Sequence, residues 1–84
     1  MTREEIVKIV NTFLIEEIEI EQDAIKDDAR LIEDLGIDSL DFVDIVVIVE
    51  QHFGFKIKPE EMKEVRTLSQ FYDYIESKIE SKLQ

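Results

Sequence analysis

The residue best suited to chemistry in this sequence is Ser39, which directly follows Asp38 at the predicted start of a helix. The first backbone N–H groups of a helix have no partners within it, and the helix dipole presents its positive end there. A phosphate group on the Ser39 hydroxyl would therefore be favourably placed. A serine in this position also commonly helps to cap its helix, and the residue types alone leave both interpretations open.

The rest of the sequence does not support catalysis by Ser39. The one histidine, His52, lies 13 residues further along the same predicted helix, which separates the two by roughly 20 Å. The segment around Ser39 lacks the second glycine of a nucleophile elbow. The chain has no cysteine, which excludes thiolate metal sites, and no segment matches an EF-hand loop. We therefore expect no catalytic residue and no metal site.

Two long helices are predicted to position Ser39 and to form much of the core. The first spans residues 3–17 and begins with a capping box, in which Thr2 precedes Glu5 by three residues. The second spans residues 39–53. Its β-branched run is typical of a strand, but the Asp38 cap before it and Gly54 after it favour a helix. The apolar faces of the two helices consist of Ile6, Ile9, Val10, Phe13 and Leu14, and of Phe42, Ile45, Val46, Val49 and Phe53.

The remaining segments complete a small helical bundle. A short helix is predicted over residues 59–64, because proline is favoured in a first helical turn, and a last helix follows the capping pattern at residues 67–70. The loop over residues 21–36 is long, and Gly36 supplies a backbone bend at its end. Apolar residues should pin this loop to the core: Ile20, Ile25, Ala29, Leu31, Ile32 and Leu35. The buried face of the last helix should comprise Leu68, Phe71, Tyr72, Ile75 and Ile79. We therefore predict an all-α bundle of three main helices plus one short helix, with a long loop between helices one and two, in a single domain over residues 1–84.

The net charge restricts the classes of partner. The chain has 21 acidic and 10 basic residues and a net charge of −11, so it should repel nucleic acids and anionic lipids and attract proteins with basic patches. No apolar run approaches the roughly 18 residues that span a bilayer. The first residues do not resemble a signal peptide, so we expect a cytoplasmic protein that does not enter membranes.

The second predicted helix has more apolar residues than one core stripe requires. Leu40, Val43 and Val47 fall on its flank, beside Asp41, Asp44 and Glu50. One interpretation is that these apolar residues pack under the long loop. The other is that they form a docking strip flanked by acids, and helical spacing favours neither.

The run from Leu31 to Asp41, LIEDLGIDSLD, closely resembles the signature of acyl carrier proteins. The core of that signature is the triplet Asp38-Ser39-Leu40, preceded by a glycine and by an acidic-leucine step. The resemblance extends across nearly the whole chain, through Phe53-Gly54 and the short helix that begins at Pro59.

The resemblance implies a non-catalytic acyl carrier. Ser39 would carry 4′-phosphopantetheine through a phosphodiester, and the thiol of that group would hold acyl intermediates as thioesters. The implied partners are a phosphopantetheinyl transferase and acyl-transferring and ketosynthase-type enzymes with basic patches, of fatty-acid, polyketide or related lipid synthesis. The implied docking positions are Asp38, Leu40, Asp41, Asp44, Val47 and Glu50, with Glu60, Glu61 and Glu64 as weaker candidates.

Three positions depart from the common family pattern. Phe42 stands where a smaller residue is usual, Val47 stands where many fatty-acid carriers have methionine, and Lys58-Pro59 replaces the usual Pro-Asp order. We hypothesise that Phe42 narrows the mouth of a cavity between helices that shelters the acyl chain. A D-alanyl or aminoacyl carrier and an unmodified acidic helical adaptor for a basic protein are the alternative functions. We expect a monomer in each case.

Overall fold

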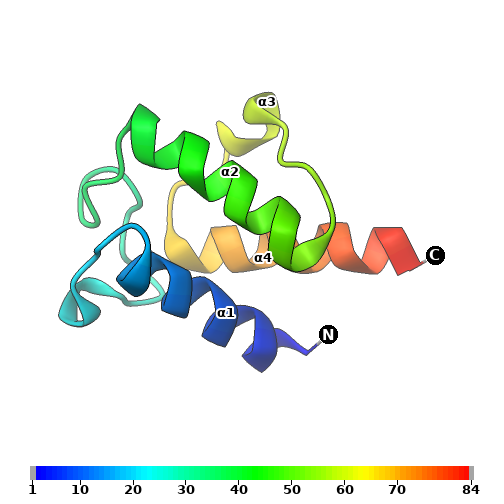
Figure 1. The fold of residues 1–84 in the computed structure, drawn as a ribbon, viewed down its shortest axis with the longest axis horizontal. Helices are drawn as coiled ribbons and strands as arrows, with labels where there is room; N and C mark the ends of the chain where they lie inside the picture. Colours follow the sequence, from blue (N-terminus) through cyan, green and yellow to red (C-terminus); the bar gives the residue numbers. More distant parts are fainter. Residues whose placement is uncertain (1, 84) are drawn as a thin grey trace.

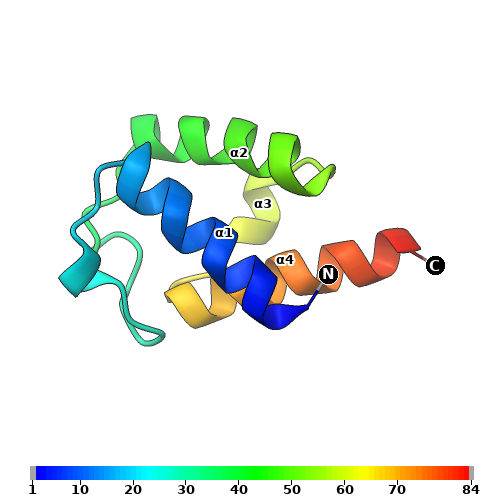
Figure 2. The same cartoon turned by 60° about the horizontal axis from the view of Figure 1, so that its bottom comes forward.

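A computed structural model describes the chain from residue 2 to residue 83, and its side chains as far as residue 80. Over this range the elements are α1 (Arg3–Glu16), a 3₁₀ turn η1 (Gln22–Ala24), α2 (Ser39–Phe53), α3 (Pro59–Met62) and α4 (Leu68–Leu83). Figures 1 and 2 show the three long helices packed together, with α3 on the connection between α2 and α4. The all-α prediction of three main helices and one short helix is therefore confirmed.

The helices begin and end at the residues whose side chains and backbone favour those ends. The Thr2 hydroxyl accepts a hydrogen bond from the Glu5 backbone N–H at 3.2 Å, as the capping pattern predicts. Asp38 caps α2, and Gly54 ends it with φ at 77°, a left-handed conformation that suits glycine. The β-branched run inside α2 is therefore helical, since its ends and its buried face outweigh its strand propensity.

Two predicted helix ends were wrong by one or two residues. The first helix ends at Glu16, because the Ile18 and Ile20 backbone N–H groups donate to the Phe13 and Leu14 carbonyls and so depart from the i to i−4 pattern, with Glu19 at φ 65°. The third ends at Met62 and not at residue 64. There the Val65 backbone N–H donates to the Met62 carbonyl at 3.0 Å, which turns the chain toward α4.

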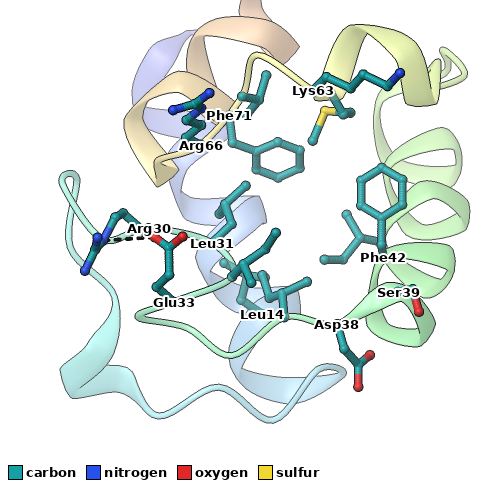
Figure 3. A pocket seen from close by; sticks show the side chains of 15 residues that line it. Leu14, Arg30, Leu31, Glu33, Asp38, Ser39, Phe42, Lys63, Arg66 and Phe71 are labelled. Atoms are coloured by element: carbon teal, nitrogen blue, oxygen red, sulfur yellow. Dashed lines mark ion pairs between the residues drawn. The ribbon is translucent and has the colours of Figure 1, made fainter.

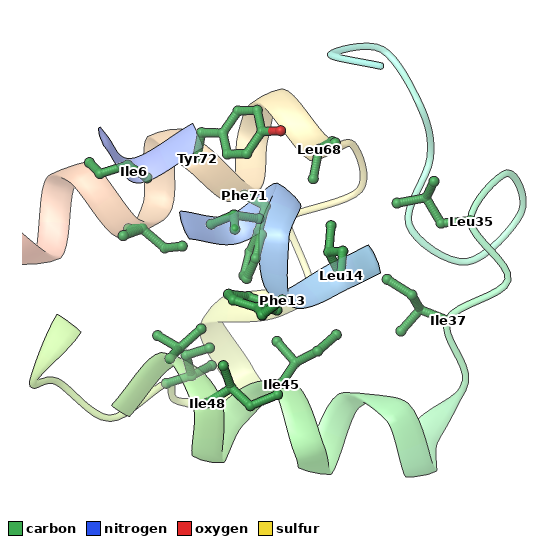
Figure 4. Close-up of a cluster of buried hydrophobic side chains, with 14 of the residues drawn as sticks. Ile6, Phe13, Leu14, Leu35, Ile37, Ile45, Ile48, Leu68, Phe71 and Tyr72 are labelled. Atoms are coloured by element: carbon green, nitrogen blue, oxygen red, sulfur yellow. The ribbon is translucent and has the colours of Figure 1, made fainter. Parts of the chain in front are cut away.

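One hydrophobic core joins the long helices. In Figure 4, Phe13 of α1 lies between Phe71 of α4 and the side chains of Ile45 and Ile48 from α2. The predicted faces are buried or packed against this core in all three helices. The fully buried side chains of largest volume are Tyr72, Phe71, Ile6, Leu14, Leu68, Ile75, Val10 and Val49.

The long loop between α1 and α2 is fixed by backbone hydrogen bonds to a distant segment. The backbone N–H groups of Leu31, Leu68 and Ser69 donate to the carbonyls of Arg66, Ala29 and Asp27, respectively, at 2.9 Å each. These bonds tie residues 27–31 to residues 66–69 at the entry to α4. Gly36 has φ at 70°, so the predicted bend is present.

The loop is pinned to the core by most of the predicted residues, with one exception. Ala29 and Leu35 are buried, and Ile20, Ile25 and Leu31 are partly buried against the core. Ile32 is 72% exposed, so the prediction that it helps to pin the loop was wrong. The turn that begins at Leu31 directs Leu31 and Leu35 toward the core, and the residue after Leu31 consequently points to solvent.

None of the helices in the described residues is long and apolar enough to cross a membrane.

Tyr72 is a buried aromatic side chain with a polar tip at the edge of this core. It is 2% exposed, and its hydroxyl donates a hydrogen bond to Oδ1 of Asn11. The Arg3 guanidinium lies 5.4 Å from the centre of its ring. Burial disfavours the charged phenolate and, with the Asp27 carboxylate nearby, raises the pKa of Tyr72 from 10.0 to about 12.

This raised pKa predicts a loss of stability at high pH. Between pH 10 and about 12 the unfolded chain releases the Tyr72 proton while the folded chain keeps it, so the stabilising contribution falls as the pH rises. Urea unfolding across this range should show a steeper decline for the native chain than for Tyr72→Phe. Equal slopes for the two proteins would contradict the assignment. Lysines titrate in both proteins and therefore cancel in the comparison.

Candidate functional site

Ser39 is the first residue of α2, and its side chain is exposed. The cap of this helix comes from its neighbours. The Asp38 carboxylate accepts the Asp41 backbone N–H at 2.9 Å, and the Asp41 carboxylate accepts the Asp38 backbone N–H at 3.4 Å. No residue that the structure describes accepts a hydrogen bond from the Ser39 hydroxyl. The interpretation that Ser39 serves mainly as a cap is therefore not supported, and its hydroxyl is available for chemistry.

The helix start gives the Ser39 hydroxyl an electrostatic setting that suits a bound phosphate. The positive end of the α2 dipole lies at this residue. The first amide N–H groups, those of Ser39 and Leu40, have no acceptor among the described residues and can be offered to an anion. These groups offset the repulsion between a phosphate and the carboxylates of Asp38 and Asp41.

A cavity of about 760 Å³ opens beside Ser39. Figure 3 shows its walls, with the Phe42 ring on the same side as Ser39 and the Phe71 ring across from it. Phe42 lies one helical turn after Ser39, is partly buried and lines the cavity, where the sequence hypothesis requires it. The apolar wall comes from α1, the loop, α2, the α3 region and α4, and it includes Leu14, Leu31, Ile37, Phe42, Ile45, Met62, Val65 and Phe71.

Most of these wall residues could not be assigned to a site from the sequence. They come from separate segments of the chain. In each segment the apolar spacing is the same for a residue that fills the core and for one that lines a cavity, so the spacing cannot distinguish the two. Met62, interpreted from the sequence as a core residue, is partly buried against the core and also lines the cavity. Only Phe42 carries a local signal, through its departure from the family pattern.

Charged residues surround the cavity mouth. The Arg30 guanidinium contacts the carboxylates of Glu33 at 3.1 Å and Asp34 at 3.3 Å. Asp34 also accepts the Arg30 backbone N–H at 2.8 Å, and this hydrogen bond, followed by that of the guanidinium, lowers the pKa of the Asp34 carboxyl. Lys63 and Arg66 lie on the side of the cavity opposite Asp38 (Figure 3).

The apolar residues on the flank of α2 are exposed, which decides whether they pack under the long loop. Leu40, Val43 and Val47 are 76%, 60% and 48% exposed. The interpretation that they pack under the long loop is therefore wrong. We call these three residues, together with the exposed acids Asp38, Asp44 and Glu50, the acidic strip. Asp41 is not part of the acidic strip, because its side chain is partly buried and its carboxylate accepts the Asp38 backbone N–H within the helix cap.

The acids on and after α3 fall into two groups. Glu60 and Glu64 are exposed. Glu61 contacts the Lys78 ammonium at 2.8 Å and accepts the Tyr74 hydroxyl at 3.2 Å. The Lys78 contact is the main cause of the lowered pKa of the Glu61 carboxyl. A partner would have to compete with Lys78 for Glu61, whereas it could reach Glu60 and Glu64 directly.

No group of three or more acidic or histidine side chains in the described part of the chain is arranged to hold a metal ion. Asp34 is held by Arg30, and Asp38 and Asp41 are held by the helix cap.

The chain matches a protein-family model and several known relatives over most of its length. Residues 8–75 match the family model described as "Phosphopantetheine attachment site". The acyl carrier protein of Thermotoga maritima is 36% identical over 78 residues, which cover 93% of this chain and 96% of that protein. The acyl carrier protein of Coprothermobacter proteolyticus is 35% identical over 82 residues, 98% of this chain and 100% of that protein. That of Campylobacter hominis is 36% identical over 73 residues, 87% of this chain and 92% of that protein.

Because the family model and these relatives cover most of the chain, the chain belongs to the acyl carrier protein family, whose members carry a covalently attached 4′-phosphopantetheine and act as carriers rather than as catalysts.

Proposed function

We propose that this chain carries acyl intermediates on 4′-phosphopantetheine attached to Ser39 and delivers them to enzymes that dock on the acidic strip. One observation carries the proposal. The Ser39 hydroxyl is exposed and is not used by the helix cap, and Ser39 is one of the residues that line an apolar cavity.

The residues around Ser39 fit the phosphate of the attached group. The positive end of the α2 dipole and the first amides of the helix favour the phosphodiester charge. The thiol at the far end of the group, when it is bound, supplies the point at which an acyl chain is held as a thioester. Ser39 itself anchors the group.

The cavity supports an apolar acyl group over the alternative cargoes. Its walls are mostly aliphatic and aromatic side chains, against which a hydrocarbon chain gains roughly 25 cal/mol per Å² of buried apolar surface. A D-alanyl or aminoacyl group would place an ammonium there without a buried acid to pair with it. The cavity therefore favours partners of fatty-acid, polyketide or related lipid synthesis. An unmodified adaptor is not favoured, because it would require neither the cavity nor a free serine.

The acidic strip supports weak and rapid docking. Exposed carboxylates attract basic partners over a distance and raise the rate of encounter. The apolar residues between them provide a small dry contact. A carrier that visits several enzymes in turn needs contacts that form quickly and also break quickly.

The attachment site is tested by intact mass. Incubation with coenzyme A and a broad phosphopantetheinyl transferase should add one phosphopantetheine to the native chain and none to Ser39→Ala. Ser69→Ala is a matched control, because Ser69 also lies in the first turn of a helix and this variant should gain the full mass. An unchanged mass of the native chain with several competent transferases would favour the unmodified adaptor.

The docking surface is tested by charge reversal at Asp44 and Glu50. Both carboxylates are exposed on α2, whereas reversal at Asp41 would also disturb the helix cap. Asp44→Lys and Glu50→Lys should slow acyl transfer to partner enzymes and flatten its dependence on salt, with the fold retained by circular dichroism. Glu16→Lys, on α1, changes the net charge equally and should leave transfer unchanged. Unaltered transfer by the α2 variants at low salt would show that docking occurs elsewhere.

The role of Phe42 is tested by replacing its ring with a smaller side chain. If the ring narrows the cavity mouth, the native chain should protect a medium-chain thioester from hydroxylamine better than a long-chain one. Phe42→Val should extend protection to the longer chain. Val47→Ala, on the exposed strip, is the control and should change neither rate. Equal protection of both lengths in both Phe42 proteins would reject the hypothesis.

A further inference from the structure

Ile32 is an exposed isoleucine in a segment whose other apolar residues face inward. Leu35 is buried and Leu31 is partly buried in the same turn. Ile32 therefore contributes much less buried apolar surface to the core than Leu31 or Leu35, and a polar residue at this position would leave the fold intact. Its exposure calls for another explanation.

The backbone around Ile32 is held firmly, so the side chain cannot simply fold back into the core. The Leu31 backbone N–H is bonded to Arg66, and the Ile32 carbonyl accepts the Gly36 backbone N–H at 3.1 Å. The Arg30 guanidinium ties the same turn together through Glu33 and Asp34. The turn thus presents Ile32 outward in a fixed position.

Ile32 and Ser39 line the same cavity, so the exposed isoleucine and the proposed attachment residue belong to one region of the surface. This shared region matters most for an enzyme that acts on Ser39 itself. Such an enzyme must bring its active site to bond-forming distance of the Ser39 oxygen and must therefore cover the exposed residues around it. Enzymes that act on the thiol work at the far end of a long arm and have no such requirement.

We propose that Ile32 is a contact residue for the phosphopantetheinyl transferase, which covers Ile32 with an apolar patch while its basic residues meet the acidic strip. This inference rests on the proposed attachment at Ser39. The distribution of unpaired acids on this chain supports a partner surface with an apolar part facing Ile32 and a basic part facing the acidic strip. Arg30 pairs with Glu33 and Asp34 beside Ile32 and offsets part of their charge, whereas no ion pair among the described residues engages Asp38, Asp44 or Glu50.

The experiment measures the rate of mass gain with coenzyme A and a transferase as the concentration of the apo chain is varied. Ile32→Ser should raise the KM by about fivefold or more, the effect expected for loss of an apolar contact near an interface centre, and should leave kcat unchanged. Ile32→Val should restore most of the affinity. Ile15→Ser is the matched control, because Ile15 is a partly exposed isoleucine of α1 outside both the core cluster and the cavity wall.

The outcomes separate this inference from the proposed function. An unchanged KM for a folded Ile32→Ser variant overturns the inference, and so does a fall in kcat alone, which would indicate disturbed placement of Ser39. A native dimer that Ile32→Ser dissociates, seen by sedimentation, assigns Ile32 to a second copy of the chain and also overturns it. Failure of the native chain to gain mass at Ser39 refutes the proposed function itself.

Discussion

Two carboxylates accept hydrogen bonds from backbone N–H groups at the start of α2, and the rest of the site depends on this arrangement. Asp38 and Asp41 exchange hydrogen bonds with each other's backbone, so the helix is capped without help from Ser39. Ser39 can then lie in the first turn, where the helix dipole favours an anion, and still direct its hydroxyl outward. If Ser39 supplied the cap, its oxygen would be turned toward the backbone and would be poorly placed for modification.

The cavity depends on a second constraint, which links segments far apart in the chain. Backbone hydrogen bonds between residues 27–31 and 66–69 hold the loop against the entry to α4. This contact brings Leu31 and Ile37 opposite Phe42 of α2 and Phe71 of α4. The same bonds fix the turn on which Ile32 stands. One set of main-chain contacts thus shapes the apolar cavity and also the surface that presents Ile32.

The features that the sequence predicted correctly have local causes. Thr2, Asp38 and Gly54 act on the backbone within a few residues, so their effects on helix ends could be inferred from residue type. Apart from the two helix ends, the error arose where a distant segment decides the outcome. The outward direction of Ile32 depends on the pairing of Leu31 with Arg66, which leaves no local pattern in the sequence. The family resemblance implied roles for Ser39 and the flank of α2, which stay predictions, whereas the three-dimensional structure showed that Leu40, Val43 and Val47 face solvent.

Under the proposed attachment at Ser39, an acyl chain in the neighbouring cavity would take part in the folding equilibrium. Because it would be tethered to the protein, its local concentration would not depend on the amount of protein in the cell. The cavity walls come from segments that separate on unfolding, so the acyl chain would bind only the native chain and shift the equilibrium toward it. A protease would then degrade the empty form faster than the loaded form, without any change in sequence.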